Sequence, residues 1–287
     1  MSVGATTAGV RPVRAGRQPH LPAWLGTLPF FAYVGVFLLW PTGILVVDAF
    51  KTPGGAWNFG VLPTLWGPVA RGFFIGSFKL CLLSAVAGAV FGALVAYAVA
   101  SGNPDGAVRR FAVAGSGVLA QFGGVTLAFA FQALIGPVGL LFHASWYYNF
   151  PWSIALIYTY FQIPLMVLVF LPAIDGLKAQ WREASESLGS STWQYWRYVA
   201  GPLLTPAFLG AFLLLFANAL SAYATIVAWE NQIAYTVPQA IGTALTSEVG
   251  LANVNAAELL AFGMIVMVAV VMTGYALLQR RAARWLR

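Results

Sequence analysis

The sequence has few charged residues and a single cysteine. Charged side chains make up 8% of its 287 residues, whereas apolar side chains make up 60%. Soluble domains carry about 25% charged residues, and a soluble domain of this size could not bury so much apolar surface. The composition therefore predicts one polytopic membrane domain. Cys81 lies inside an apolar run, which excludes an intrachain disulfide and a thiolate metal cluster.

The sequence also lacks the motifs of nucleotide and metal chemistry. The Gly-x4-Gly-Lys-Ser/Thr phosphate loop is missing, so the chain is not itself an ATPase. The two histidines, His20 and His143, lie far apart outside the apolar runs. A membrane-embedded enzyme would need a nucleophile–base pair or metal ligands within its spans. We therefore expect no catalytic residue, no metal site and no cofactor bound by this chain.

Apolar runs long enough to cross a bilayer, which takes about 20 residues, occur six times. We expect an all-α membrane protein with six transmembrane helices over residues 24–50, 72–99, 111–135, 151–174, 203–229 and 258–279. The spans define one permease-like domain over 23–280. Residues 1–22 are expected to form a flexible tail, since no small-residue cleavage site follows them, and 281–287 a basic tail.

The lysines and arginines predict the orientation of these spans. One side holds Arg11, Arg14, Arg17, Arg109, Arg110, Lys178, Arg182, Arg197, Arg280, Arg281, Arg284 and Arg287, and the other holds only Lys51, Arg71 and Lys79. Basic residues accumulate on the cytoplasmic side, so we expect both termini and residues 175–202 there. The protein is then a multi-pass protein of a bacterial-type inner (cytoplasmic) membrane. This placement also explains the net charge of +7 without a nucleic-acid partner.

Residues 175–202 form the one long polar segment between apolar runs. Leu177, Trp181, Ala184 and Leu188 recur at three- and four-residue steps, which predicts a helix with an apolar face. A glycine follows this helix and predicts its end. The serines and threonine after the glycine predict an N-cap for a second short helix.

Within the first of these helices, Glu183 has no basic residue three or four positions away, whereas Arg182 can pair with Glu186. An acidic side chain without a local partner is either merely solvated or available to another protein. Spacing alone favours the solvated interpretation.

The same segment resembles the EAA loop of permease subunits of ATP-binding-cassette (ABC) importers. Glu183-Ala184-Ser185, three residues, Gly189, nine residues, Val199, one residue and Gly201-Pro202 follow the family pattern Glu-Ala-Ala, three, Gly, nine, Ile, one, Leu-Pro. Serine for alanine and valine for isoleucine are mild departures. Gly201 for leucine is a larger one, and it puts the end of the loop in doubt. The resemblance covers residue 21 to the C-terminus and looks closest to the polyamine-type permeases.

This resemblance implies a type I importer fold with a cytoplasmic coupling helix between spans four and five. The partners it implies are a second permease subunit in a heterodimer, two ATPase subunits that use ATP and Mg²⁺, and an extracytoplasmic binding protein. The ATPase-coupling residues would be Glu183, Ala184, Ser185, Leu188, Gly189 and Pro202. The polyamine substrate is implied by the resemblance alone, since iron(III), phosphonates and thiamine use similar permeases.

Polar residues inside the expected spans are candidates for the translocation path, because such residues are expensive in a membrane. We select Gln121, Tyr160, Gln162, Asn218, Ser221 and Tyr223. Neutral polar groups also bind between helices, so packing is the competing role for each. The competing class for the whole chain is an ion-coupled secondary transporter, which often has inverted repeats; no clear internal repeat is present.

Overall fold

The computed structural model describes residues 24–52, 54–136, 140, 150–229, 236–246 and 254–283. The chain divides into two compact units, Met1–Ile44 and Leu45–Arg287, each described by itself below. The described part is helical, as the sequence predicts. It also contains one isolated β-bridge, between Lys51 and Trp57. Both expected tails, apart from residues 281–283, lie outside the described residues, as do parts of the expected outer segments.

The first unit begins with α1 (Trp24–Val34), followed by a π-helical turn, η1 (Gly35–Leu39). Next comes α2 (Trp40–Asp48), which continues into the second unit. The π-turn is closed by the N–H of Trp40, which donates to the carbonyl oxygen of Gly35. Pro41 follows directly and has no N–H to donate, so the wide turn precedes a gap in the helical hydrogen bonds. The apolar stretch Thr27–Asp48 is long enough to span a membrane.

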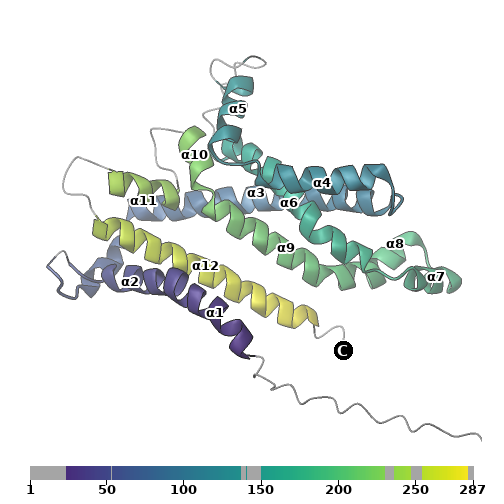
Figure 1. The fold of residues 1–287 in the computed structure, drawn as a ribbon, viewed down its shortest axis with the longest axis horizontal. Coiled ribbons are helices and arrows are strands. Elements are labelled where there is room, and N and C mark those ends of the chain that lie inside the picture. The colour runs from purple at the N-terminus through teal and green to yellow at the C-terminus, as the bar shows by residue number, and fades with distance from the viewer. Residues whose placement is uncertain are drawn as a thin grey trace, which may run out of the picture. The chain divides into compact units, whose positions relative to one another are not determined.

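The second unit contains the remaining helices (Figure 1). They are η2 (Phe59–Trp66), α3 (Pro68–Ala100), α4 (Ala107–Gln121), α5 (Val125–Ile135), α6 (Trp152–Asp175), α7 (Ala179–Ser187), α8 (Thr192–Tyr195), the π-turn η4 (Trp196–Ala200), α9 (Gly201–Ser221), α10 (Tyr223–Trp229), α11 (Val237–Thr246) and α12 (Val254–Ala283).

The core of this unit is the contact of α3 with α6. Small residues at four-residue spacing on α3 allow the two backbones to come close, as expected for membrane helices. A Cβ added to Gly88 would lie 2.6 Å from the Cβ of Gln162, and one added to Gly92 would lie 2.8 Å from the carbonyl oxygen of Ile163. Helix α9 packs on both α3 and α6, so these three helices bury most of the apolar core.

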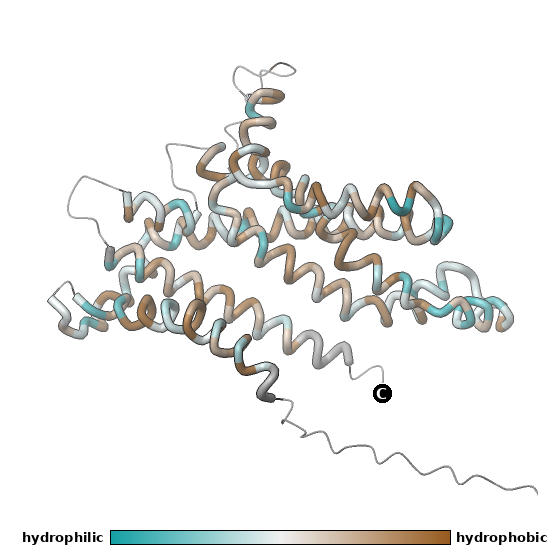
Figure 2. The backbone as a smooth tube through the Cα atoms, viewed as in Figure 1, coloured by the Kyte–Doolittle hydropathy of each residue, from teal (hydrophilic) through white to brown (hydrophobic). Residues whose placement is uncertain are grey.

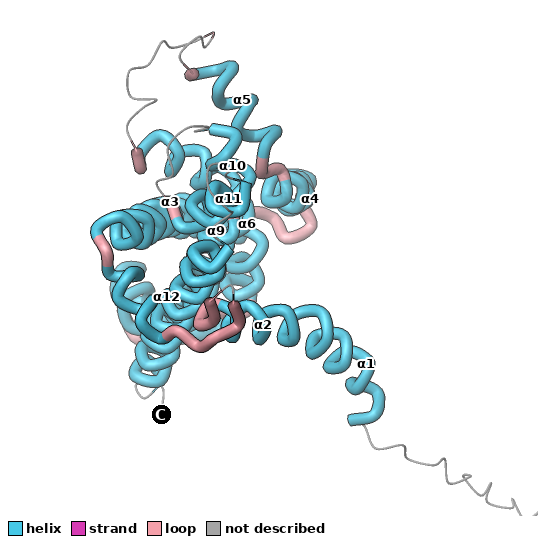
Figure 3. Tube along the Cα trace, turned by 90° about the vertical axis from the view of Figure 1, so that its left-hand side faces the viewer, coloured by secondary structure: helices cyan, strands magenta, loops and turns pink. Residues whose placement is uncertain are grey.

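The expected third span is not one straight helix. Helices α4 and α5 meet at a bend of 97°, and Figures 1 and 3 both show α5 leaving the end of α4 steeply. The bend lies at Gly123–Gly124, where Gly124 has a φ of +74° that side chains disfavour. Among the described residues, five helices are long and apolar enough to span a membrane, and the count reaches six if the bent pair is one span.

The expected fifth span ends earlier than predicted, because α9 stops at Ser221 and α10 begins anew at Tyr223. Between them, Ala222 leaves the helical conformation, with φ −78° and ψ 63°. Its carbonyl oxygen accepts a hydrogen bond from the hydroxyl of Tyr158 on α6. No glycine or proline marks this break, so no local residue type predicts it.

The residues between the expected fifth and sixth spans, 230–257, contain a helix, α11, that was not predicted. Helix α11 packs along α12. The backbone N–H of Val237 at its start donates to the hydroxyl of Ser77 on α3 at 2.8 Å. The described part of this segment is therefore packed against other helices of the second unit.

Candidate functional site

The polar segment folds as two short helices beyond the ends of the long ones. Helix α7 follows α6 after three residues, and α8 leads through η4 into α9. Figure 2 shows this end of the second unit in hydrophilic colours beside the apolar lengths of α6 and α9. The predicted pair of short helices around Gly189 is thus present.

A complete glycine cap ends α7. Gly189 has a φ of +77°, its N–H donates to the carbonyl oxygen of Glu186 at 2.9 Å, and the N–H of Ser190 donates to that of Ser185 at 3.1 Å. These two bonds form the Schellman motif, in which a left-handed glycine satisfies the last carbonyls of a helix. The Ser190 hydroxyl adds a further bond to the Ser185 carbonyl oxygen at 2.8 Å.

A capping box starts α8. The N–H of Gln194 donates to the hydroxyl of Ser191 at 3.3 Å, and the N–H of Ser191 donates to the Gln194 side-chain oxygen at 2.8 Å. Such reciprocal bonds satisfy two of the free N–H groups at a helix start. The turn between α7 and α8 is therefore fixed on both sides of Gly189.

The end of the segment contains the largest departure from the family pattern. The N–H of Gly201 donates to the carbonyl oxygen of Trp196, which makes η4 a π-turn, and Pro202 follows in the first turn of α9. A side chain at position 201 would crowd this turn, since a Cβ there would lie 2.6 Å from the Trp196 carbonyl oxygen. Glycine in place of leucine thus fits the close approach of position 201 to the Trp196 carbonyl oxygen.

Helix α7 carries an exposed acidic side chain that has no partner among the described residues. Within the described residues the carboxylate of Glu183 has no hydrogen-bond or ion-pair partner, and the residue is exposed. Arg182 does pair with Glu186, Nε to Oε1 at 2.9 Å, as predicted, and this hydrogen bond raises the pKa of Arg182. Leu188, which directly follows α7, is 87% exposed, so this apolar side chain is not buried in the core of its own chain.

The inner side of the segment is anchored to the long helices. The ring of Trp196 lies edge-on to that of Tyr97 near the end of α3, with centroids 5.2 Å apart. Tyr195 is only 7% exposed. A cavity of about 340 Å³ between α3, α6 and the two short helices is lined in part by Leu177 and Ser190. The segment is therefore held on one face and free on the other.

Four of the six predicted path residues come together at the helix breaks. Gln121, Asn218, Ser221 and Tyr223 line one cavity of about 410 Å³ at the α4–α5 bend and the α9–α10 break. Thr225 also lines it, and its hydroxyl accepts a hydrogen bond from the N–H of Gly124 at 3.0 Å. Thr225 was not among the predicted path residues. The residues that line this cavity carry no formal charge.

The other two predicted path residues do not line this cavity. Gln162 is fully buried between α6 and α3, where its Nε2 donates to the hydroxyl of Ser84 at 3.2 Å. Its Oε1 has no partner among the described residues. Tyr160 packs edge-on against Phe131 of α5, with ring centroids 5.8 Å apart. The surroundings of Gln162 therefore favour a role in interhelical packing over a role in a solute path.

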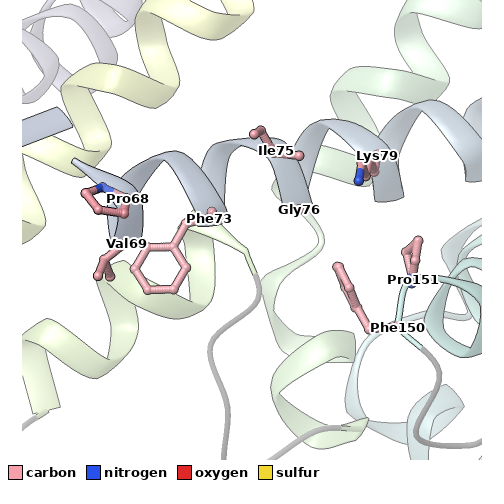
Figure 4. A pocket seen from close by; sticks show the side chains of 9 residues that line it. Pro68, Val69, Phe73, Ile75, Gly76, Lys79, Phe150 and Pro151 are labelled. Carbon is pink, nitrogen blue, oxygen red and sulfur yellow. The ribbon is translucent and has the colours of Figure 1, made fainter. Parts of the chain in front are cut away.

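A third, mostly apolar cavity of about 450 Å³ lies at the start of α3 (Figure 4). Figure 4 shows Pro68, Val69 and Phe73 at one end of it, with Lys79 near Phe150 and Pro151 at the other. No ion pair joins Lys79 to Glu258 in the described part of the chain, although the sequence allowed one.

Comparisons with known proteins bear on the fold and the family. No family model matches the chain. It is 26% identical over 188 residues to a probable sulfate transport system permease protein of Marchantia polymorpha, covering 64% of this chain and 65% of that protein. It is 24% identical over 239 residues to the sulfate transport system permease protein of Escherichia coli K12, covering 75% and 79%. The alignments span just under two thirds of the Marchantia relative and of a Helicosporidium relative.

Solved structures agree on the architecture. A bacterial ABC transporter that imports alginate superposes with a TM-score of 0.70 over 90% of this chain and 94% of that chain, at 17% identity. The methionine ABC transporter gives 0.58 over 77% and 98%. The fold is that of ABC importer permeases. The expected fold class is thereby confirmed, whereas the polyamine expectation is not supported, since the sequence relatives are named for sulfate.

Proposed function

We propose that this chain is a transmembrane permease subunit of an ABC importer, and that α7 is the helix through which an ATPase subunit drives it. The observation that carries the proposal is the exposed, unpaired Glu183 on a helix whose end is fixed by a glycine cap. A charged group at such a surface gains most from a cationic partner on another protein. The exposed Leu188, directly after α7, adds an apolar contact.

ATP hydrolysis in this proposal belongs to two partner subunits, which bind ATP and Mg²⁺. A second permease subunit completes the path, and an extracytoplasmic binding protein delivers the solute. The alginate transporter, which has this fold, is known in complex with a periplasmic protein. ATP-driven closure of the ATPases would shift the population between inward- and outward-facing states, by binding one state more tightly. Both termini and α7 then lie in the cytoplasm.

We propose sulfate as the solute. The similarity to sulfate permeases supports this choice. The chemistry of the cavity at the helix breaks agrees with it. The amide groups of Gln121 and Asn218 and the hydroxyl of Thr225 can donate hydrogen bonds to an oxyanion, and no carboxylate lines the cavity to repel one. A polyamine would instead be expected to meet carboxylates, because burying unpaired cations is costly.

The test is transport by the complete complex in proteoliposomes, with the binding protein supplied outside. We expect labelled sulfate uptake that requires ATP on the ATPase side and persists when ionophores abolish all ion gradients. Uptake that needs a gradient and ignores ATP would establish the secondary transporter instead. Uptake of labelled spermidine, with no uptake of labelled sulfate, would overturn the choice of solute and leave the importer class intact.

A further inference from the structure

Arg109, in the first turn of α4, forms a two-pronged ion pair with Asp175, the last residue of α6. The guanidinium Nη1 donates to Oδ1 at 3.2 Å, and Nη2 donates to Oδ2. The side chains are 19% and 38% exposed, so the pair is partly sheltered from water. The two other ion pairs between described residues each join groups three or four positions apart, whereas this one joins two helices.

Asp175 lies three residues before α7, and the connection between them is short and hydrogen-bonded. The N–H of Gly176 donates to the carbonyl oxygen of Pro172 at 3.1 Å, and that of Leu177 donates to the carbonyl oxygen of Ile174 at 3.0 Å. Because this connection is short and hydrogen-bonded, a displacement of α7 should also displace Asp175. The displacement would then pass to the side chain that binds the Asp175 carboxylate.

Helix α4 joins this ion pair to the cavity at the helix breaks. Its 15 residues span about 22 Å. Arg109 lies at one end, and Gln121, which lines the cavity, lies at the other. The outer face of α4 is open, since Val108 and Phe111 are 82% and 85% exposed. The position of α4 thus depends on its contact with α6, and the ion pair fixes the end nearer α7.

We propose that the Arg109–Asp175 pair is a positioning element that carries movement of α7 through α4 to the solute cavity. The consequence for transport rests on the proposed function above. The geometry suits the task, because two parallel N–H to oxygen bonds fix orientation as well as distance. A lysine at position 109 would keep the positive charge but could not make the two parallel hydrogen bonds that a guanidinium makes to a carboxylate.

The first arm of the test measures position without transport. Spin labels at Val118 on α4 and Ser187 on α7, in a chain with the buried Cys81 replaced by alanine, report the distance between the helices. We expect one narrow distribution in the parent chain, broad distributions in Arg109→Asp and in Asp175→Arg, and a narrow one again in the double swap. Arg110→Asp is the matched control, because within the described part of the chain Arg110 binds only the carbonyl oxygen of Asp105, in the turn before α4. Distributions that stay narrow in both single variants would overturn the proposal.

The second arm measures coupling in proteoliposomes that hold the complete complex. Coupling free energies commonly correspond to factors of 5–150, so we expect each single variant to lower the sulfate carried per ATP hydrolysed by about fivefold or more. The double swap should restore most of it, and Arg109→Lys should lie between. A swap no better than the single variants would refute the proposal. If the parent complex itself shows no ATP-driven uptake, the proposed function fails, while the distance measurements still decide whether this pair positions α4.

Discussion

The N–H of Ser190 donates to the carbonyl oxygen of Ser185 at 3.1 Å, across the turn that ends α7. This bond requires the left-handed conformation of Gly189 between them, with φ +77°. Nothing lies within 4 Å of the place where a Cβ on Gly189 would be. The turn therefore selects glycine for its backbone conformation and not for space.

Substitutions at Gly189 should consequently follow backbone preference and not side-chain size. A left-handed conformation costs an ordinary residue about 1–2 kcal/mol, while asparagine adopts it more readily. We expect uptake to be nearly normal in Gly189→Asn, impaired in Gly189→Val and lost in Gly189→Pro, with equal amounts of each protein in the membrane. The measurement is initial uptake rate against the immunoblot signal of the membrane fraction. Equal uptake by the asparagine and proline variants would contradict the role of this turn.

Reversing the charge at Glu183 should remove the ATPase from the complex. If Glu183 meets a basic group on the ATPase, Glu183→Arg replaces attraction by repulsion at a desolvated contact, and affinity should fall by at least about tenfold. The measurement is the binding of purified ATPase subunits to the permease in nanodiscs. The control is Glu186→Arg on the same helix, since Glu186 faces Arg182 of its own chain. If both reversals weaken binding equally, general charge and not a specific contact is responsible.

The sequence allowed the periodic and locally encoded parts of this structure to be predicted. The glycine cap at Gly189 and the Arg182–Glu186 pair follow from residue types at fixed spacings. The break at Ala222 does not follow from any such local pattern. It is stabilised by the Tyr158 hydroxyl from a distant helix, so no local signal encodes it.

The same reason explains the mixed result for the polar residues within the spans. Gln121 and Asn218 line a cavity, while Gln162 is enclosed, and all three are neutral amides in apolar runs. Which face of a helix meets which neighbour depends on tertiary packing. The Arg109–Asp175 pair was likewise hidden, because 66 positions separate its members.

These different surroundings predict opposite outcomes for two amide substitutions. Asn218→Leu removes a hydrogen-bonding group from the cavity, so we expect sulfate uptake to fall about tenfold or more while the complex still assembles. Gln162→Met removes a buried amide whose Oε1 has no partner and leaves Ser84 bound to the carbonyl oxygen of Leu80. Uptake and melting temperature should then stay near those of the parent. A transport defect in Gln162→Met at normal stability would restore Gln162 to the path.

The contact of α3 with α6 can be tested without any assumption about function. In Gly92→Ala the added Cβ would lie 2.8 Å from the carbonyl oxygen of Ile163, which is backbone and cannot rotate away. Overpacking of this kind typically costs about 1–3 kcal/mol, so the purified chain in detergent should melt several degrees lower. Gly117→Ala on α4 is the matched control, because no atom lies within 4 Å of its added Cβ. A melting temperature for Gly92→Ala equal to that of Gly117→Ala would show that α3 and α6 are not in close contact at Gly92. The burial of Gln162 between these two helices would then be contradicted as well.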